Sequence, residues 1–292
     1  MPDVQFSELG FIDEGGNLHM LTNTINFHES DFSLCADGVN AVFSTLPQGD
    51  VYKCVFNRTE KTLTNRTLVI EGRNCPSVPA NAPATGAKMD IWVPYMHQKW
   101  DTPDWFPGGW SCGPSSCLMA VQKYSILPVH TITCSSPTAH THDFGWYVPT
   151  EYTFNGYTYD ILGVAPSETW VPGAHGFICR EYGGAVWAYM VTFLQQHLLS
   201  SWQAGTAYAT FTAEIDAGYP VVASTSTLGY GHIQCFRGHF YNHAIIANDP
   251  YGNANISGWG TRRDGECVYY DWPGYDNGYS ELGVSQLIVA RH

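Results

Sequence analysis

The segment "GGWSCGPSSCLMAVQKY" (108–124) contains the two residues best suited to nucleophilic chemistry. Cys112 is followed by Gly113 and Pro114, and proline favours the first turn of a helix. A thiol at that place meets the positive end of the helix dipole and unpaired backbone N–H groups, which favour the thiolate. Cys117 lies one turn further along, on the apolar stripe. We expect Cys112 to be a nucleophile and Cys117 to be packed in the core; an inert, capping Cys112 is the alternative.

A thiolate nucleophile needs a cationic partner that also gives a proton to the leaving group, and histidine is suited to this role. His232 opens a strand in "GHIQCFRG" (231–238), and Asp249 closes the following strand in "NHAIIANDPYG" (242–252). Antiparallel neighbours bring the start of one strand beside the end of the next. Asp249 is therefore placed to orient the imidazole of His232. His243 is a rival base.

The elements that must position these groups are predicted by periodicity. Apolar residues recur at helical spacing over about 114–124 and 184–202, and a short helix is expected at 211–218. Strand-like runs then follow at 221–225, 232–238, 244–249, 267–272 and 287–291. Helices followed by antiparallel strands predict an α+β domain over residues 91–292.

The first part of the chain follows a different pattern. Short alternating runs at 18–27, 41–46, 51–57 and 66–72, separated by turn residues, predict a small all-β domain over 1–73. The segment 74–90 is rich in proline and alanine and is typical of a semi-rigid linker. We expect the β domain to be a targeting or binding module.

Between the two long helices lies an aromatic segment, 128–183, with little helical period. Long loops often bind ligands, so its aromatic side chains either line a substrate groove or pack beneath the loop. These side chains are Trp146, Tyr147, Tyr152 and Tyr157. The cluster of His140, His142 and Asp143 is only weak evidence for a metal site, and we expect no metal or organic cofactor.

Charge and cysteine content limit the partners and the compartment. The formal charge of −13, with 13 Lys and Arg, argues against nucleic acid and favours a neutral or cationic partner. No run is apolar enough for a membrane span, and the N-terminal residues lack the features of a signal peptide, so the chain stays in its cell or a leader has been removed. Nine cysteines leave at least one that is unpaired or pairs between chains, and Asn-x-Thr/Ser triplets at Asn57, Asn65 and Asn255 are compatible with export. We expect an extracellular or cell-surface location; the sequence gives no oligomeric state.

The segments 93–124, 218–225, 231–238 and 248–252 together resemble the C39-like branch of the papain-like cysteine peptidases. The resemblance covers residues 91 to about 275, and its specific parts are the Cys-Gly-Pro element and the Gly-His strand followed by Asn-Asp-Pro. It implies a papain-like fold, in which the nucleophile helix packs on an antiparallel sheet that carries histidine and aspartate. Here the small all-β domain precedes that fold.

The resemblance also implies a role for each site residue. Cys112 would be the nucleophile, His232 the general base and acid, and Asp249 the orienting carboxylate. Gln98 would form the oxyanion hole together with the backbone N–H of Cys112. The insertion "DTPDWFPGGW" (101–110) separates Gln98 from Cys112, so a surface position for Gln98 is the alternative.

These roles predict a cysteine peptidase that hydrolyses peptide bonds through a thioacyl-enzyme intermediate. The substrates expected in an acidic, aromatic groove are cationic leader peptides or the stem and bridge peptides of bacterial cell walls. The β module favours cell-wall or surface polymers, because a β module before a hydrolase often serves targeting. Two alternatives stay open. The same site would serve an acyl-transferring transamidase or transpeptidase, and a papain-like scaffold can also hold a ligand without catalysis.

Overall fold

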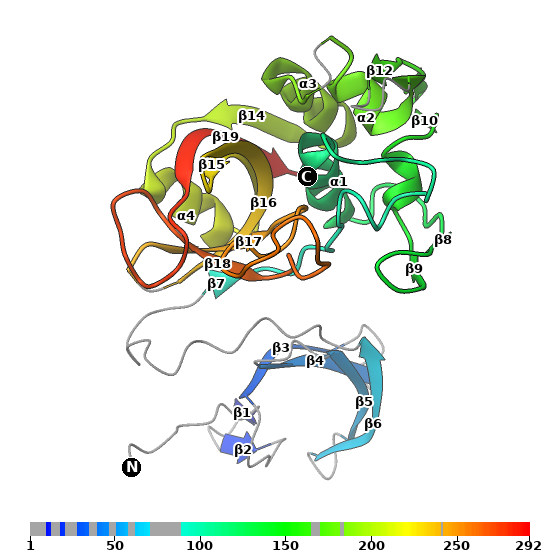
Figure 1. Cartoon of the computed structure of the whole chain (residues 1–292). Coiled ribbons are helices and arrows are strands. Elements are labelled where there is room, and N and C mark those ends of the chain that lie inside the picture. Colours follow the sequence, from blue (N-terminus) through cyan, green and yellow to red (C-terminus); the bar gives the residue numbers. More distant parts are fainter. Residues whose placement is uncertain are drawn as a thin grey trace. The chain divides into compact units, whose positions relative to one another are not determined.

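The computed structural model divides the chain into two compact units, Met1–Pro79 and Ala80–His292 (Figure 1). It describes residues 90–292 except 165–169, 182, 183 and 241, and before residue 90 only the backbone of the strands.

Every described element of the first unit is a β-strand. The strands are β1 (Gly10–Ile12), β2 (Leu18–Met20), β3 (His28–Leu34), β4 (Asn40–Leu46), β5 (Val51–Asn57) and β6 (Thr62–Ile70). β1 pairs with β2, and β3 to β6 form a four-stranded antiparallel sheet in chain order. The predicted linker lies outside the described residues, except for its last two positions in β7, and the targeting role of the unit stays a prediction.

The second unit has a mixed α+β architecture around one curled antiparallel sheet (Figure 1). The strand order is β14 (Ser200–Ala204), β19 (Gly283–Arg291), β15 (Val221–Thr227), β16 (Tyr230–Phe240), β17 (Ala244–Asn248) and β18 (Val268–Asp271). A short strand, β7 (Met89–Asp90), also pairs with β16, beyond a bulge between Phe236 and Gly238. The central strands β15, β16 and β17 are rich in buried residues and form the floor of the core.

Helices cover both faces of this sheet. α1 (Cys112–Gln122) packs on β16 and is itself contacted by α2 (Gly173–Ile178) and α3 (Trp187–His197), whereas α4 (Tyr208–Asp216) packs on β16 from the other side. The alternation of side chains along β16 explains this division, since successive residues face opposite ways. Cys235 lies near Cys117 of α1, and the next residue, Phe236, contacts Phe211 of α4 at a ring distance of 5.3 Å.

The nucleophile helix is a core element. Every residue of α1 from Gly113 to Gln122 is buried, and only Cys112, the first residue, is partly exposed. Gly113 is needed because a Cβ at this position would lie 2.4 Å from the Cβ of Ala185. The helix therefore brings its N-terminal thiol to the surface while the rest of it is enclosed.

Two predicted boundaries differ from the structure. The helix predicted over 184–202 ends at His197, because Leu198 is extended and the chain continues into β14, which pairs with β19. The predicted loop 128–183 contains α2, a 3₁₀ turn at Gly145–Tyr147 and three short hairpins. These pair β8 (Ile132–Cys134) with β9 (His140–His142), β10 (Thr153–Phe154) with β11 (Tyr157–Thr158), and β12 (Gly163–Val164) with β13 (Trp170–Val171).

The aromatic side chains of this segment pack against one another. Tyr147 and Tyr152 are buried, and Tyr152 stacks on Tyr159 at a centroid distance of 4.6 Å. Trp146 stacks on His130 at 4.0 Å. Tyr147 and Tyr152 are therefore packed beneath the loop and do not line a substrate groove.

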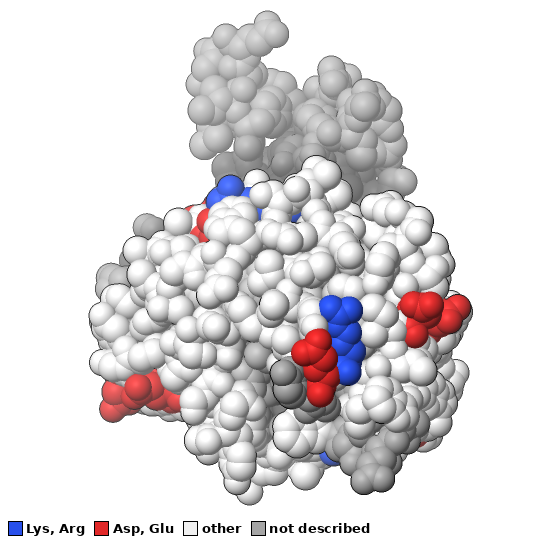
Figure 2. Space-filling model, turned by 90° about the horizontal axis from the view of Figure 1, so that it is seen from above, with Lys and Arg blue, Asp and Glu red and all other residues white. Residues whose placement is uncertain are grey.

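The surface seen in Figure 2 carries few charged side chains, and its Asp and Glu residues lie in small separate groups. This face therefore shows no continuous acidic patch. Within the described residues, no helix has both the length and the apolar character needed to cross a membrane.

Candidate active site

The structure brings together Cys112, His232 and Asp249. Cys112 is a free thiol at the start of α1, and its side chain lies close enough to His232 to interact with the imidazole. Nε2 of His232 lies 2.7 Å from Oδ1 of Asp249. Since Nε2 contacts the carboxylate, Nδ1 is the ring nitrogen left for the thiol. The three side chains thus form one continuous chain of polar contacts.

Strand register explains why His232 and Asp249 meet although they are 17 positions apart in the sequence. β16 and β17 pair Cys235 with Asn248, so Asp249, which follows β17, lies beside the part of β16 that contains Gln234 and His232. His243, the rival base, precedes β17 and therefore lies at the opposite end of that strand from Asp249. It stacks on Tyr275 at 3.8 Å.

The carboxylate of Asp249 is fully buried and accepts hydrogen bonds from five groups. Oδ1 accepts from Nε2 of His232 and from the backbone N–H of Tyr251, the latter at 2.8 Å. Oδ2 accepts from the hydroxyl of Tyr270 at 2.6 Å, from Nε2 of Gln234 at 2.9 Å and from Nε1 of Trp259 at 3.3 Å. These donors fix the carboxylate's orientation and hence that of the imidazole.

Charge interactions keep His232 protonated. Burial by itself disfavours the imidazolium, but the negative charge and hydrogen bond of Asp249, together with the contact with Cys112, raise its pKa to about 10. Trp259 and Tyr251 pack edge-on against the ring, with centroid distances of 5.1 and 6.2 Å, and limit the access of water. The Cys112 side chain therefore lies beside a cation.

Cys117 lies in a different environment. It is completely buried, and burial raises the pKa of its thiol well above the usual value. Burial therefore distinguishes the two cysteines: Cys117 is enclosed in the core, whereas the partly exposed Cys112 lies beside the His232 imidazolium.

Gln98 lies beside the segment that leads into α1, in spite of the insertion. The chain from 99 to 111 folds back, so that Nε2 of Gln98 donates to the carbonyl oxygens of Gly108 at 2.8 Å and Gly109 at 3.0 Å. Gly108 has a φ of 63°, and a Cβ there would lie 2.0 Å from the Gln98 carbonyl oxygen, so only glycine fits. Gln98 is buried, which excludes a surface position, but both of its amide hydrogens are directed at carbonyl groups.

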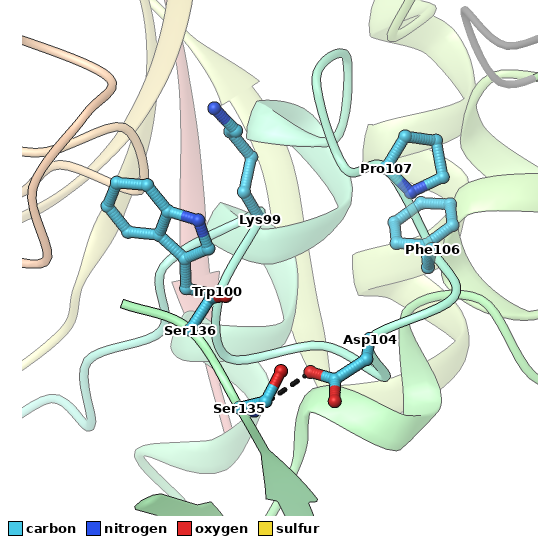
Figure 3. Close-up of a pocket in the computed structure, with 7 residues that line it drawn as sticks. All are labelled: Lys99, Trp100, Asp104, Phe106, Pro107, Ser135 and Ser136. Atoms are coloured by element: carbon cyan, nitrogen blue, oxygen red, sulfur yellow. Dashed lines mark hydrogen bonds between the residues drawn. The ribbon is translucent and has the colours of Figure 1, made fainter. Parts of the chain in front are cut away.

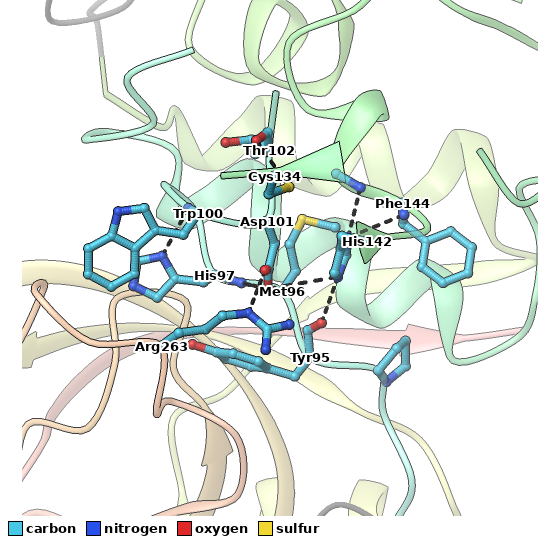
Figure 4. Close-up of polar contacts among 12 residues, drawn as sticks. Tyr95, Met96, His97, Trp100, Asp101, Thr102, Cys134, His142, Phe144 and Arg263 are labelled. Carbon is cyan, nitrogen blue, oxygen red and sulfur yellow. Dashed lines mark hydrogen bonds and ion pairs between the residues drawn. The ribbon is translucent and has the colours of Figure 1, made fainter. Parts of the chain in front are cut away.

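A second buried carboxylate, Asp101, holds the turn that carries Gln98 (Figure 4). Its Oδ2 accepts from the backbone N–H of His97 at 2.7 Å, and its own N–H donates to the carbonyl of His97. Oδ1 contacts Nε of Arg263 at 2.5 Å and Nε2 of His140 at 2.8 Å. Burial alone would raise the pKa of Asp101, but His142 and Arg263 outweigh it and lower the pKa.

The three residues considered for a metal site have other partners. His140 contacts Asp101, His142 lies 3.0 Å from the carbonyl oxygen of Tyr95, and Asp143 accepts from Thr131 at 2.7 Å. Across the described ranges, no group of three or more His, Cys, Asp or Glu side chains is arranged to hold a metal ion.

A pocket of about 210 Å³ lies next to Gln98 in the chain, along the insertion (Figure 3). Lys99 and Trp100 line one side, Phe106 and Pro107 the other, and Asp104 accepts from the backbone N–H of Ser135 at 2.9 Å across the base. The insertion thus forms a concave surface, and Cys112, His232 and Asp249 do not line it.

Several residues of the site were not predicted. Gln234 could have been found, since it stands two positions after His232 and so shares its face of the strand. Tyr270 and Trp259 reach Asp249 from other elements, and no local signal marks them.

The comparisons with known proteins give no match: no family model fits the chain, and neither a curated protein nor a solved structure is similar enough to count as one.

Proposed function

We propose that this protein is a cysteine peptidase with a papain-like fold of the C39-like type, which hydrolyses peptide bonds through a thioacyl-enzyme intermediate. The observation that carries the proposal is the contact of Cys112, partly exposed at the start of α1, with an imidazole whose other nitrogen is bound to a buried carboxylate. Nucleophile, base and orienting group stand in the order that thiol hydrolysis requires.

In the proposed reaction, the Cys112 thiolate attacks the substrate carbonyl and forms a tetrahedral intermediate. The His232 imidazolium donates its proton to the departing amine, which leaves the acyl group on sulfur. Neutral His232 then takes a proton from water as the water attacks the thioester, and the acid and the thiol are released. Asp249 holds the imidazole in place throughout.

The oxyanion would be held by backbone N–H groups of the first turn of α1 and by the amide of Gln98. The first turn of a helix leaves its N–H groups without intrahelical acceptors. Gln98 must release one of its two carbonyl partners, Gly108 or Gly109, to take part. A small movement of the glycine-containing loop is therefore part of the proposed mechanism.

The proposed substrates are peptides, with those of cell walls or surface polymers favoured. Acyl transfer to an amine instead of water is the nearest alternative and uses the same four residues. The protonated His232, held by the buried Asp249 and next to the partly exposed Cys112, supports an active site over a ligand-binding scaffold, because strongly perturbed pKa values beside a nucleophile cluster at functional sites.

The test is digestion of a mixed peptide library and of purified peptidoglycan by the wild type and by Cys112→Ala, with products identified by mass spectrometry. New termini that appear only with wild type support hydrolysis, and cross-linked products support acyl transfer. Cys117→Ala is the matched control, since it removes a neighbouring thiol outside the site. Identical digests from wild type and Cys112→Ala would refute the proposal.

A further inference from the structure

Ser111, the residue before the candidate nucleophile, forms a buried hydrogen bond with a distant histidine. Its Oγ lies 2.9 Å from Nδ1 of His175, which belongs to α2. Both side chains are completely buried. His175 also packs edge-on against Phe106, with a centroid distance of 5.2 Å, so its ring is held firmly.

The direction of this hydrogen bond follows from the other ring nitrogen. Nε2 of His175 lies 3.3 Å from the carbonyl oxygen of Val164, which can only accept, so Nε2 carries the proton. Burial lowers the pKa of His175 to about 4, which keeps the ring neutral. Nδ1 is therefore an acceptor, and the hydroxyl of Ser111 donates to it.

Ser111 occupies the N-cap position of α1 but does not act as an ordinary cap. An N-cap serine usually has an extended backbone, and its Oγ accepts from the N–H of the second or third helical residue. The third residue here is Pro114, which has no N–H, so Gly113 is the one available donor. Ser111 instead has φ −95° and ψ 19° and makes no side-chain cap hydrogen bond.

We propose that the hydrogen bond from Ser111 to His175 keeps the start of α1 uncapped, so that the N–H of Gly113 remains available to the Cys112 thiolate and to the oxyanion. His175 is thus a positioning residue that acts through Ser111. The part concerning the oxyanion rests on the proposed peptidase function, whereas the part concerning the thiolate does not.

Removal of the acceptor should release the hydroxyl. In His175→Phe, Ser111 can rotate towards an N-cap conformation, and its Oγ then accepts the N–H of Gly113. The Cys112 sulfur loses a hydrogen-bond donor and gains a nearby lone pair, so its alkylation near pH 6 should slow by about tenfold. Loss of one oxyanion donor would lower kcat by about 10²-fold.

The decisive variant is the double substitution Ser111→Ala/His175→Phe. Alanine has no hydroxyl to cap the helix, so the double variant should recover most of the alkylation rate that His175→Phe alone has lost. His175→Asn, whose Oδ1 can replace Nδ1 as acceptor, should stay close to wild type. His197→Phe is the matched control, because His197 is also buried and has a pKa lowered to about 4.

The experiment measures the iodoacetamide rate at Cys112 by mass spectrometry from about pH 5 to about pH 9, together with thermal unfolding of each full-length variant. A double variant as slow as His175→Phe, or a His175→Phe variant as fast as wild type, overturns the proposal. His175→Met repeats the test if phenylalanine prevents folding. Alkylation that follows the predicted pattern in a protein without hydrolytic activity would refute the peptidase function and leave the role of His175 standing.

Discussion

Asp249 and Asp101 are two buried carboxylates, and each contacts the Nε2 of a histidine. We call each carboxylate with its contacting side chains a cluster; the two clusters differ in the third side chain that takes part. Asp249 lies 2.7 Å from His232, and Asp101 lies 2.8 Å from His140. The histidine beside Asp249 also contacts the Cys112 thiol, whereas Asp101 is bound to the guanidinium of Arg263. The same pair of residue types therefore stands in two different electrostatic settings.

The difference lies in what compensates the buried charge. Arg263 keeps its proton at any ordinary pH, so Asp101 is neutralised by a permanent cation. Among the described residues, no Lys or Arg side chain forms an ion pair with Asp249, and the compensating charge is the proton held on His232. That proton can leave and return. The Asp249 cluster can therefore take part in proton transfer, while the Asp101 cluster holds the turn that carries Gln98.

The largest expected effect is that of His232→Ala. Loss of the proton carrier should lower kcat by at least about 10³-fold with little change in fold. His140→Ala, the matching change in the other cluster, should keep kcat within a few-fold. Steady-state kinetics on a peptide from the library screen, with circular dichroism for folding, checks both. Equal losses in two folded variants would contradict the contrast between the clusters.

Gln98→Ala should lower kcat by about 10²-fold, the usual cost of one oxyanion donor. Gln98 also holds Gly108 and Gly109, so a second readout is needed to separate the two roles. Burst kinetics with an activated ester provide it, since a missing oxyanion donor slows both acylation and deacylation. An unchanged kcat in a folded Gln98→Ala variant would remove Gln98 from the oxyanion hole.

Asp249→Asn should change the pH dependence of kcat/KM more than it changes the maximal value of kcat. The raised pKa of His232 means that the active, protonated form persists up to about pH 10 in the wild type. Without the carboxylate charge the pKa falls, so the basic limb of kcat/KM should move towards neutral pH. Because the pKa of His232 is higher in the folded than in the unfolded protein, its protonation also stabilises the fold. The His232–Asp249 pair should make its full contribution below about pH 6.5 and lose it as the pH rises towards 10. A basic limb at the same pH in both proteins would refute this assignment.

The smallest expected effect on activity is that of Asp101→Asn. The substitution removes the carboxylate charge that Arg263 contacts and should lower the free energy of unfolding by about 3 kcal/mol, the low end for buried pairs because Arg263 is partly exposed. kcat should fall only a few-fold, through looser positioning of Gln98. Urea unfolding and kinetics on the same samples measure the two effects. A large loss of kcat with unchanged stability would mean that the Asp101 cluster takes part in the chemistry.

Local sequence determined the position of the thiol and most of the central strands. The sequence predicted a helix over about 114–124 with Cys112 at its N-terminal end, and α1 begins at Cys112 and ends at Gln122. Alternation and turn residues predicted β15, β16, β17 and β19 within a few residues, because strand period and turn chemistry are properties of neighbouring positions. The helix over 184–202 was too long, since pairing of β14 with β19 outweighs helical periodicity there.

Only the tertiary structure decided which polar groups meet. Asp101 reaches Arg263 across 162 residues, Ser111 reaches His175 across 64, and Asp249 collects Gln234 and Tyr270 from two other strands. For these residues, the sequence predicted only the contact of Asp249 with His232; it gave no sign that Asp101 meets Arg263 or that Ser111 meets His175. Whether a buried carboxylate is compensated by a fixed guanidinium or by a movable proton depends on neighbours brought in by the fold, and no local pattern contains that information.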